Sequence, residues 1–338
     1  MRKGGCEMKK AEKKKGRLWK QLFLFISLSA CFYTVRSLFF AIPEVGHFKT
    51  KAGQAAYLKS YERIMESMPV KAQVQDVETS WGLVRVYRWS NETVTDKTPV
   101  LLFPGHSSGA PMWQGNISYL MLQHPVYAFD PLGDAGKSKQ ALPLKNMQDV
   151  ADYVNEMLDR LGIERVHLVG HSFGASSAAY FANDYPARVA SLALLEPAFA
   201  LNYPDVSVFF WGTVSSIELF PESWRSQALA QISGEDASEV RSDDDMAKMI
   251  KAASSFYSTE LPTPSPIDEA SLKDWKFPVY LALAEKSKMT GDSTMKQARK
   301  IPRLTMKTWP NTSHSLPMEV PQELAHELQV FWKQAESN

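Results

Sequence analysis

The stretch "LVGHSFGA" occupies Leu168–Ala175 and places Ser172 between Gly170 and Gly174. The residues leading into it are apolar, as in a buried parallel strand, and residues 172–186 follow with a helical pattern. A serine at so tight a strand-to-helix turn points its hydroxyl out of the sheet and requires small neighbours. The stretch therefore predicts an α/β fold with a nucleophilic serine at the end of a strand.

Apolar runs suited to buried parallel strands recur along the chain, with helical patterns between most of them. This alternation predicts a mostly parallel sheet flanked by helices on both faces. A hairpin pattern surrounds Trp81 and Gly82, and a helix over residues 52–68 precedes it. The expected strands are 99–103, 125–130, 165–170, 189–195, 278–284 and 303–309, and the expected helices include 147–162 and 320–334.

Residues 200–275 interrupt this alternation because they hold helical stretches but no buried strand. So long an insertion between two strands is usually functional. Its aromatic side chains favour a helical cap over a pocket at the carboxyl ends of the strands. A second packed layer without a pocket is the alternative.

The charge of the chain is unevenly distributed. Residues 1–20 hold nine of the 38 Lys and Arg side chains and two of the 37 Asp and Glu, which leaves 29 basic and 35 acidic side chains for residues 21–338. A mildly acidic body has no general attraction for nucleic acid, so no nucleic-acid partner is expected.

An uncharged apolar run, residues 21–35, follows the basic head and predicts membrane association. The flanking lysines favour a cytoplasmic N-terminus and an extracytoplasmic catalytic domain. A signal anchor, a cleaved signal peptide with secretion, and a lipoprotein signal with lipidation at Cys31 remain open. We expect residues 1–45 to form this segment and 46–338 the domain that contains the cap insertion.

Cys6 and Cys31 are the only cysteines, and both precede the expected domain. A disulfide framework or a thiolate metal site is therefore excluded from it.

Ser172 needs a base, because an alcohol is a weak nucleophile until its proton is removed. Of the seven histidines, His314 lies in the loop "WPNTSHSLPMEVPQ" between the last expected strand and the last helix. That loop opens at the carboxyl edge of the sheet, the edge at which Ser172 is expected. For the developing oxyanion, we expect the backbone amides of Phe173 and His106 to donate.

With these residues placed, the stretch from about 70 to 334 resembles an α/β-hydrolase. "LLFPGHSSGAPMW" is similar to the oxyanion loop of that family, "FDPLGDAGKS" (129–138) to the turn after its fourth strand, and "NTSHSLPMEVPQEL" to its histidine loop. The resemblance implies an eight-stranded sheet and a reaction without metal or redox cofactor.

The acid of the expected triad departs from the family pattern. Ser287 stands where the family usually has an aspartate, and serine cannot carry the charge that orients the histidine. Glu196 ends the sixth strand, a position that resembles the acid site of one branch of the haloalkane dehalogenases. Asp292 is the alternative acid, unless it caps the next helix. We favour Glu196.

The sequence thus predicts a serine hydrolase that cleaves a carboxylic ester, or a related small acyl substrate, through an acyl-enzyme. Ser172 excludes dehalogenase and epoxide hydrolase chemistry, which need a carboxylate at the turn. An acyltransferase, a C–C hydrolase and a perhydrolase of the same fold remain open. A non-catalytic binding or scaffold protein on this fold is the alternative from another class.

Overall fold

A nine-stranded sheet forms the centre of the fold, in the order β11-β10-β8-β7-β4-β5-β3-β2, with β6 paired to β3 off this path. The computed structural model describes residues 45–216, 220–236 and 243–337. The strands of this sheet are β2 (Gln73–Thr79), β3 (Gly82–Trp89), β4 (Val100–Phe103), β5 (Val126–Phe129), β6 (Lys139–Gln140), β7 (Val166–His171), β8 (Val189–Leu195), β10 (Val279–Ala284) and β11 (Leu304–Trp309).

The strands from β5 to β11 along this path pair in parallel with one another, whereas the pairs that involve β2, β3 or β6 are antiparallel. The predicted mostly parallel sheet with flanking helices is confirmed. Within this sheet, the two-residue strand β6 is added to the eight strands that were expected.

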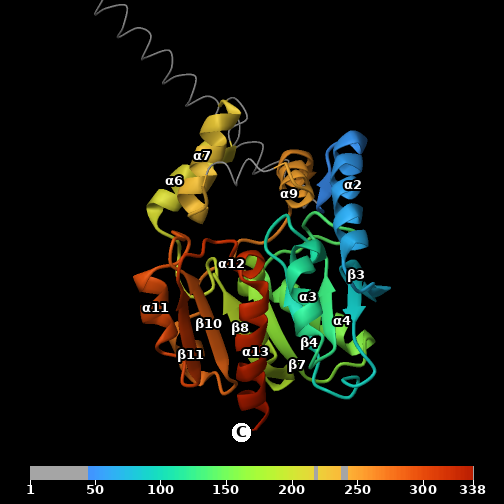
Figure 1. Cartoon of the computed structure of the whole chain (residues 1–338), viewed down its shortest axis with the longest axis vertical. Helices are drawn as coiled ribbons and strands as arrows, with labels where there is room; N and C mark the ends of the chain where they lie inside the picture. Colours follow the sequence, from blue (N-terminus) through green and yellow to red (C-terminus); the bar gives the residue numbers. More distant parts are fainter. Residues whose placement is uncertain (1–44, 217–219, 237–242, 338) are drawn as a thin grey trace, which may run out of the picture. The chain divides into compact units, whose positions relative to one another are not determined.

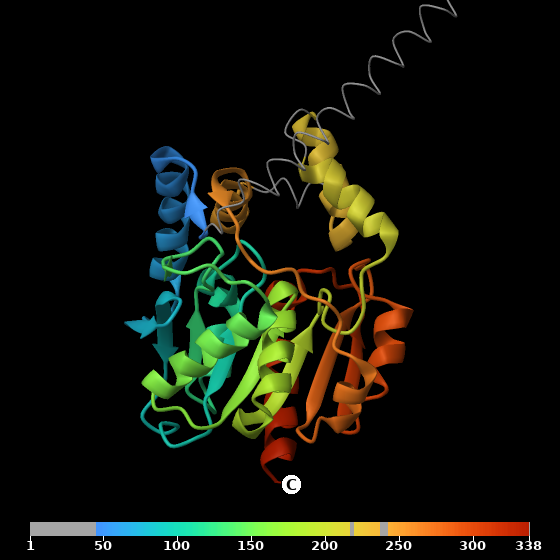
Figure 2. The same cartoon turned by 180° about the vertical axis from the view of Figure 1, so that it is seen from behind.

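Helices cover both faces of the sheet. α3 and α13 lie in front of it in Figure 1, and α4 and α5 cover the opposite face, seen in Figure 2. The helices around the sheet are η1 (Ala110–Trp113), α3 (Gln114–Leu120), α4 (Met147–Arg160), α5 (Phe173–Asp184), η2 (Pro186–Arg188), α10 (Glu269–Asp274), α11 (Asp292–Ala298), α12 (Leu316–Glu319) and α13 (Pro321–Glu336).

Two apolar clusters, one on each face, hold these layers together. β7, β8 and β10 are buried along their whole length, because helices cover both of their faces. Alternate residues of β8 therefore enter different clusters: Leu192 and Leu194 pack with α4 and α5, whereas Ala193 and Leu195 pack with α13. The central strands provide a rigid base for the loops that follow them.

The insertion between β8 and β10 carries α6 (Val206–Ser216), α7 (Glu222–Ser233), α9 (Asp245–Phe256) and β9 (Tyr257–Ser258) before α10. α6, α7 and α9 lie beyond the end of the sheet at which the parallel strands finish, at the top of Figure 1. Leu272 of α10 is buried in the core beside the sheet instead. The last part of the insertion is therefore core, and the helices before it form the cap.

The segment before the hairpin is built into the cap. α2 (Lys51–Ser67) packs along α9, with Gly53 so close to the ring of Phe256 that a Cβ atom would lie 2.3 Å from the Cβ of Phe256. β1 (His47–Phe48) pairs antiparallel with β9. Residues that precede the main sheet (α2 and β1) thus pack with residues of the insertion (α9 and β9) to form one side of the cap.

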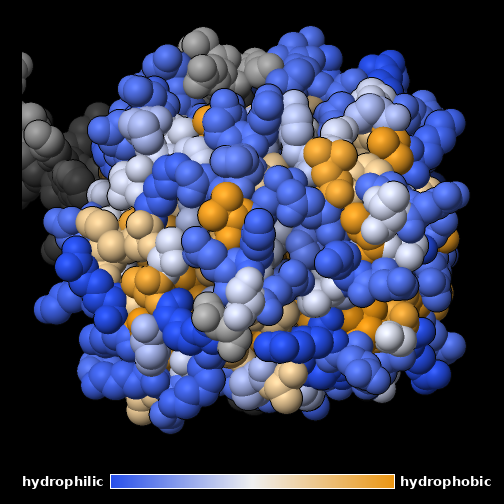
Figure 3. Space-filling view, turned by 60° about the horizontal axis from the view of Figure 1, so that its bottom comes forward, coloured by the Kyte–Doolittle hydropathy of each residue, from blue (hydrophilic) through white to orange (hydrophobic). Residues whose placement is uncertain are grey.

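The predicted membrane segment lies in residues 1–44, outside the described residues, as does the lipidation site considered at Cys31. Within the described part of the chain, no helix combines the length and the apolar character needed to cross a bilayer. With the lower end of Figure 1 turned forward, the surface is mainly hydrophilic and its hydrophobic side chains form separate patches (Figure 3).

Candidate active site

The turn between β7 and α5 holds Ser172 in a conformation that few non-glycine residues adopt, with φ 53° and ψ −119°. The backbone of the neighbouring loop approaches it closely. A Cβ on Gly174 would lie 2.3 Å from the carbonyl oxygen of Pro104, and one on Gly170 would lie 2.6 Å from the Cα of Ala175. Both positions therefore require glycine, as the sequence pattern predicts for a nucleophile turn.

Three side chains that are far apart in the sequence meet beside this turn. The hydroxyl of Ser172 lies 2.8 Å from Nε2 of His314. Nδ1 of the same imidazole lies 3.1 Å from Oε2 of Glu196. With Nδ1–H donating to the carboxylate, Nε2 is the unprotonated nitrogen that can accept the serine proton. The arrangement is the one that a Ser-His-acid relay requires.

Glu196 directly follows β8, and its side chain is fully buried, with a left-handed φ of 49°. Its Oε1 accepts hydrogen bonds from the amide of Ala284 at 2.6 Å and from the hydroxyl of Thr290 at 2.8 Å. Burial acts to raise the pKa of the carboxyl, but the hydrogen bond and charge of His314 and the hydroxyl of Ser287 outweigh it and lower the pKa. The group is therefore ionised at neutral pH.

Asp292, the alternative acid, and the nearby Glu285 make other contacts. Asp292 begins α11 with an exposed side chain and makes no hydrogen bond to His314 among the described residues. Glu285 accepts from the amide of Asn311 at 2.8 Å. Ser287, at the usual acid position, lies near enough to Glu196 for its hydroxyl to lower the pKa of that carboxyl. The serine that replaces the family acid thus supports the carboxylate on the neighbouring strand.

The backbone amides of the two expected oxyanion donors are available. Phe173 is the first residue of α5, and His106 lies in the loop after β4; neither amide N–H is hydrogen-bonded to another described residue. A side chain that sequence reasoning missed holds this loop. Asp134 accepts from the amide of Ser107 at 2.8 Å and lies 3.2 Å from Nδ1 of His106. It lies in the stretch "FDPLGDAGKS", so the quoted family turn contains the signal that could have identified it.

His171 positions the loop that carries His314. Its Nε2–H donates to the backbone carbonyl of His314 at 2.8 Å. Burial, together with the charge of His314, lowers the pKa of His171 to about 3, so the ring is neutral. A neutral ring beside His314 adds no positive charge that would oppose protonation of the base.

The cap also contacts the histidine loop. The amide of His314 donates to the carbonyl of Ser233, the last residue of α7, at 2.8 Å. The hydroxyl of Ser315 donates to the carboxylate of Glu235. The amide of Lys288 donates to the carbonyl of Ile232 at 3.2 Å. The cap is therefore fastened to the segment that carries the base.

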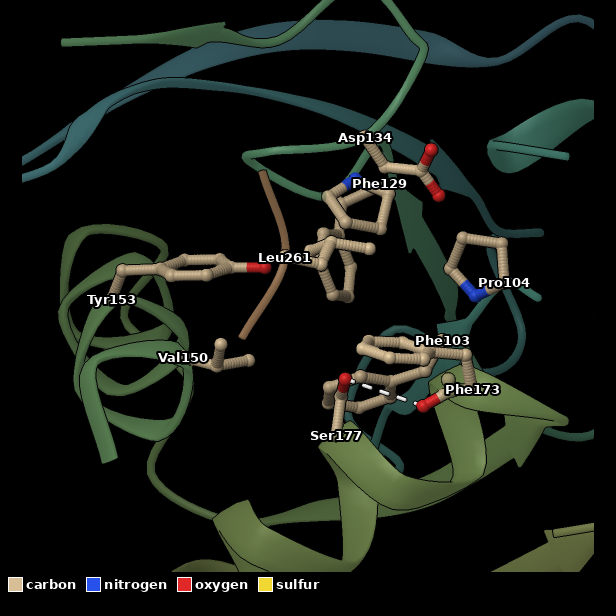
Figure 4. Close-up of a pocket in the computed structure, with 11 residues that line it drawn as sticks. Phe103, Pro104, Phe129, Asp134, Val150, Tyr153, Phe173, Ser177 and Leu261 are labelled. Carbon is tan, nitrogen blue, oxygen red and sulfur yellow. Dashed lines mark hydrogen bonds between the residues drawn. The ribbon is translucent and has the colours of Figure 1, made fainter. Parts of the chain in front are cut away.

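A small cavity of about 10 Å³ lies behind the oxyanion loop. Figure 4 shows Phe103, Phe129 and Leu261 gathered around it, with Pro104 and Phe173 at one side. Such a volume holds about one water molecule, so the cavity is a packing feature and too small for an acyl group.

Comparisons with known proteins agree with this geometry. A family model described as alpha/beta hydrolase fold matches residues 98–211. The carboxylesterase YbfK of Bacillus subtilis is 25% identical over 284 residues, which cover 79% of this chain and 90% of YbfK. The chain has the α/β-hydrolase fold, and its sequence is similar to members of that superfamily.

Further relatives match a smaller part of this hydrolase. The uncharacterized carboxylesterase nap of Bacillus subtilis is 30% identical over 142 residues. The match covers 42% of this chain and 46% of nap. The crystal structure of naproxen esterase from Bacillus subtilis superposes with a TM-score of 0.75 at 22% identity, over 84% of this chain and 99% of that one. At that identity the structural likeness shows the fold alone.

Replacing the buried acid tests its assignment. We expect Glu196→Gln to lower kcat for a p-nitrophenyl ester by about 10³- to 10⁴-fold, because a neutral amide neither stabilises the imidazolium nor selects the tautomer. The exposed Asp292→Asn variant is the matched control and should stay within about two-fold of the parent. Loss of activity in Asp292→Asn with retention in Glu196→Gln would transfer the acid role to Asp292.

Proposed function

We propose that the protein is a carboxylesterase that forms an acyl-enzyme at Ser172. The observation that supports this most directly is the continuous hydrogen-bonded series from Ser172 through His314 to the ionised Glu196. The name carboxylesterase that YbfK and nap carry is consistent with the same reaction class.

In the first half of the proposed reaction, Nε2 of His314 takes the proton of Ser172 as the oxygen attacks the ester carbonyl. Glu196 stabilises the imidazolium that forms. The carbonyl oxygen becomes an oxyanion, which accepts hydrogen bonds from the amides of Phe173 and His106. His314 then returns its proton to the alcohol oxygen, and the C–O bond breaks to release the alcohol.

In the second half, water replaces the alcohol. His314 removes a proton from the water as it attacks the acyl carbonyl, and returns that proton to Ser172 when the acid leaves. Attack by a second alcohol at this stage would instead transfer the acyl group. Aromatic side chains follow the acid and continue into the cap, with Phe199 beside Phe209 at 6.2 Å between ring centroids, and they favour an apolar group in the ester.

A fluorophosphonate probe tests the nucleophile. We expect the full-length protein in detergent to be labelled in proportion to its loss of esterase activity, because an activated serine attacks phosphorus irreversibly. Ser172→Ala should not react, whereas Ser177→Ala, on the next turn of α5, should label normally. An unlabelled parent protein with an intact fold would favour the binding or scaffold alternative.

A series of p-nitrophenyl esters of increasing acyl length tests the substrate class. Because aromatic residues follow Glu196 into the cap, we expect kcat/KM to rise from acetyl to a medium-length chain. Added alcohols should not compete with water for the acyl group, as judged by the free acid released. Formation of a new ester as the main product would indicate an acyltransferase, and a maximum at acetyl would contradict an apolar acyl pocket.

We also propose that residues 1–45 associate the protein with a membrane and place the hydrolase domain on its extracytoplasmic side. The basic head followed by an apolar run supports this. So do the exposed apolar side chains of the cap: Val206 is 80% exposed, Phe210 59% and Trp224 61%. Such side chains suit contact with a lipid surface or a lipid-derived substrate.

Fractionation of bacterial cells that express the full chain tests this location. We expect the protein in the membrane fraction after an alkaline wash, and its domain accessible to protease added outside spheroplasts. The mass of the purified chain separates an intact anchor from a cleaved signal, and Cys31→Ser tests lipidation. Recovery in the cytoplasmic fraction would contradict the proposal.

A further inference from the structure

At the edge of the sheet where the parallel strands begin, two histidines and a glutamate converge. His124 precedes β5, His167 is the second residue of β7, and Glu336 is the last residue of α13. One potential ligand atom from each lies within 4.8 Å of the others. Five residues of strand separate His167 from Ser172, about 16 Å at a rise of about 3.3 Å per residue, so the cluster is distinct from the catalytic site.

The hydrogen bond of His124 leaves one ring nitrogen unused. Its Nδ1–H donates to the backbone carbonyl of Thr98 at 2.9 Å. Because a carbonyl oxygen only accepts, Nδ1 carries the proton and Nε2 carries the lone pair. This Nε2 has no hydrogen-bond partner among the described residues, although His124 is only 4% exposed. An imidazole lone pair without a hydrogen-bond donor, on a side chain that is otherwise buried, is suited to bind a cation.

His167 can present its Nε2 in the same way. Its Nδ1 lies 2.8 Å from the hydroxyl of Ser191, which is fully buried on β8. A hydroxyl can donate or accept, so Ser191 can take the Nδ1 proton as an acceptor when Nε2 gives its lone pair to an ion. Thr98 and Ser191 then act as the outer partners that orient metal-binding imidazoles.

The spacing of the ligand atoms suits a tetrahedral ion. Nε2 of His167 lies 3.3 Å from Oε1 of Glu336. Bonds of about 2.0–2.1 Å to a tetrahedral zinc ion place two ligand atoms about 3.3–3.4 Å apart. The upper limit of 4.8 Å for the third atom means that His124 would move by no more than about 1.5 Å to complete the same geometry.

The position of the carboxylate favours a cation as well. Glu336 ends α13, where the helix dipole is negative and a carboxylate is unfavourable. A divalent ion would offset both the side-chain charge and the dipole. The side chain of Glu336 is 35% exposed, whereas that of His167 is fully buried, so an ion can enter from the surface past the carboxylate.

We propose that His124, His167 and Glu336 bind a divalent first-row transition-metal ion such as Zn²⁺, with water as the fourth ligand. Two imidazoles and a carboxylate are the ligand types that such ions prefer. The ion joins the last turn of α13 to β7 and to the loop before β5, and its role is to stabilise the fold. It takes no part in the reaction at Ser172.

Zinc binding by the full-length protein in detergent tests this proposal. After treatment with a chelator, the parent protein should bind one Zn²⁺ more per chain than Glu336→Gln does, and the affinity at this site should fall at least about 100-fold in the variant. Zn²⁺ should raise the Tm of the parent, because only the folded chain has the site. Mg²⁺ should not, because it prefers oxygen ligands to imidazole. Ester hydrolysis should be the same with and without Zn²⁺.

Two controls separate this site from other zinc ligands. Glu323→Gln, an exposed substitution in the first turn of α13, should bind Zn²⁺ like the parent. Cys6 and Cys31 can also bind zinc, but Co²⁺ held by thiolates gives a charge-transfer band that Co²⁺ held by imidazoles and a carboxylate lacks. His124→Gln removes a second ligand and should reproduce the effect of Glu336→Gln.

Equal Zn²⁺ stoichiometry in the parent, Glu336→Gln and His124→Gln would overturn the proposal, as would a parent protein that gains no Tm on Zn²⁺ addition. Circular dichroism of each variant without metal establishes that a loss of binding is not a loss of fold. Glutamine at 336 can still accept the Nε2–H of His167, so that variant is expected to fold.

Discussion

The buried negative charge of Glu196 is the constraint around which the edge where the parallel strands finish is organised. Removing a carboxylate from water costs several kcal/mol unless donors and a cation replace the water. Here the donors come from segments far apart in the chain: the end of β10, the loop after it, and the loop after β11. The carboxylate of Glu196 needs all of these donors. The ends of β8, β10 and β11 must therefore lie side by side before Glu196 can orient the imidazole of His314.

This arrangement shows how a Ser-His-acid geometry is reached with serine at the position where α/β-hydrolases usually have the acid. β8 and β10 are neighbours in the sheet, so a carboxylate moved from the end of one strand to the end of the other still reaches His314. Ser287 retains a polar role, because its hydroxyl lowers the pKa of the relocated carboxylate. The acid therefore lies at the end of β8 and not after β10, and the negative charge beside His314 is kept.

The same edge links the base to the cap. His314 is held through its backbone on two sides, by His171 below and by the carbonyl of Ser233 at the end of α7. Movement of α7 would therefore displace the main chain that carries the imidazole. A cap attached in this way can adjust to a bound acyl group only to the extent that the histidine loop moves with it.

The parts of the fold that could be predicted from the sequence are those set by local pattern. Buried strands such as β8 and the turn around Ser172 have short-range signatures, because apolar runs and glycines specify them directly. The choice between Glu196 and Asp292 has no such signature, since it depends on which strands are neighbours and on donors more than 80 residues away. The pairing of β1 with β9 was not predicted for the same reason: strands of two residues carry no periodicity.

The two ends of the sheet differ in how many residues have a strained backbone. Among the described residues, all the non-glycine positions with positive φ lie in loops at the edge where the parallel strands finish: Ser107, Ser172, Glu196, Phe199 and Asn311. Each such residue costs of order 1–3 kcal/mol and persists only where its surroundings determine it. The opposite edge, with His124, His167 and Glu336, has ordinary backbone and buried aromatic packing against Trp332. The strained backbone thus lies at one end of the strands, beside Ser172 and Glu196, and the opposite end is packed with aromatic side chains.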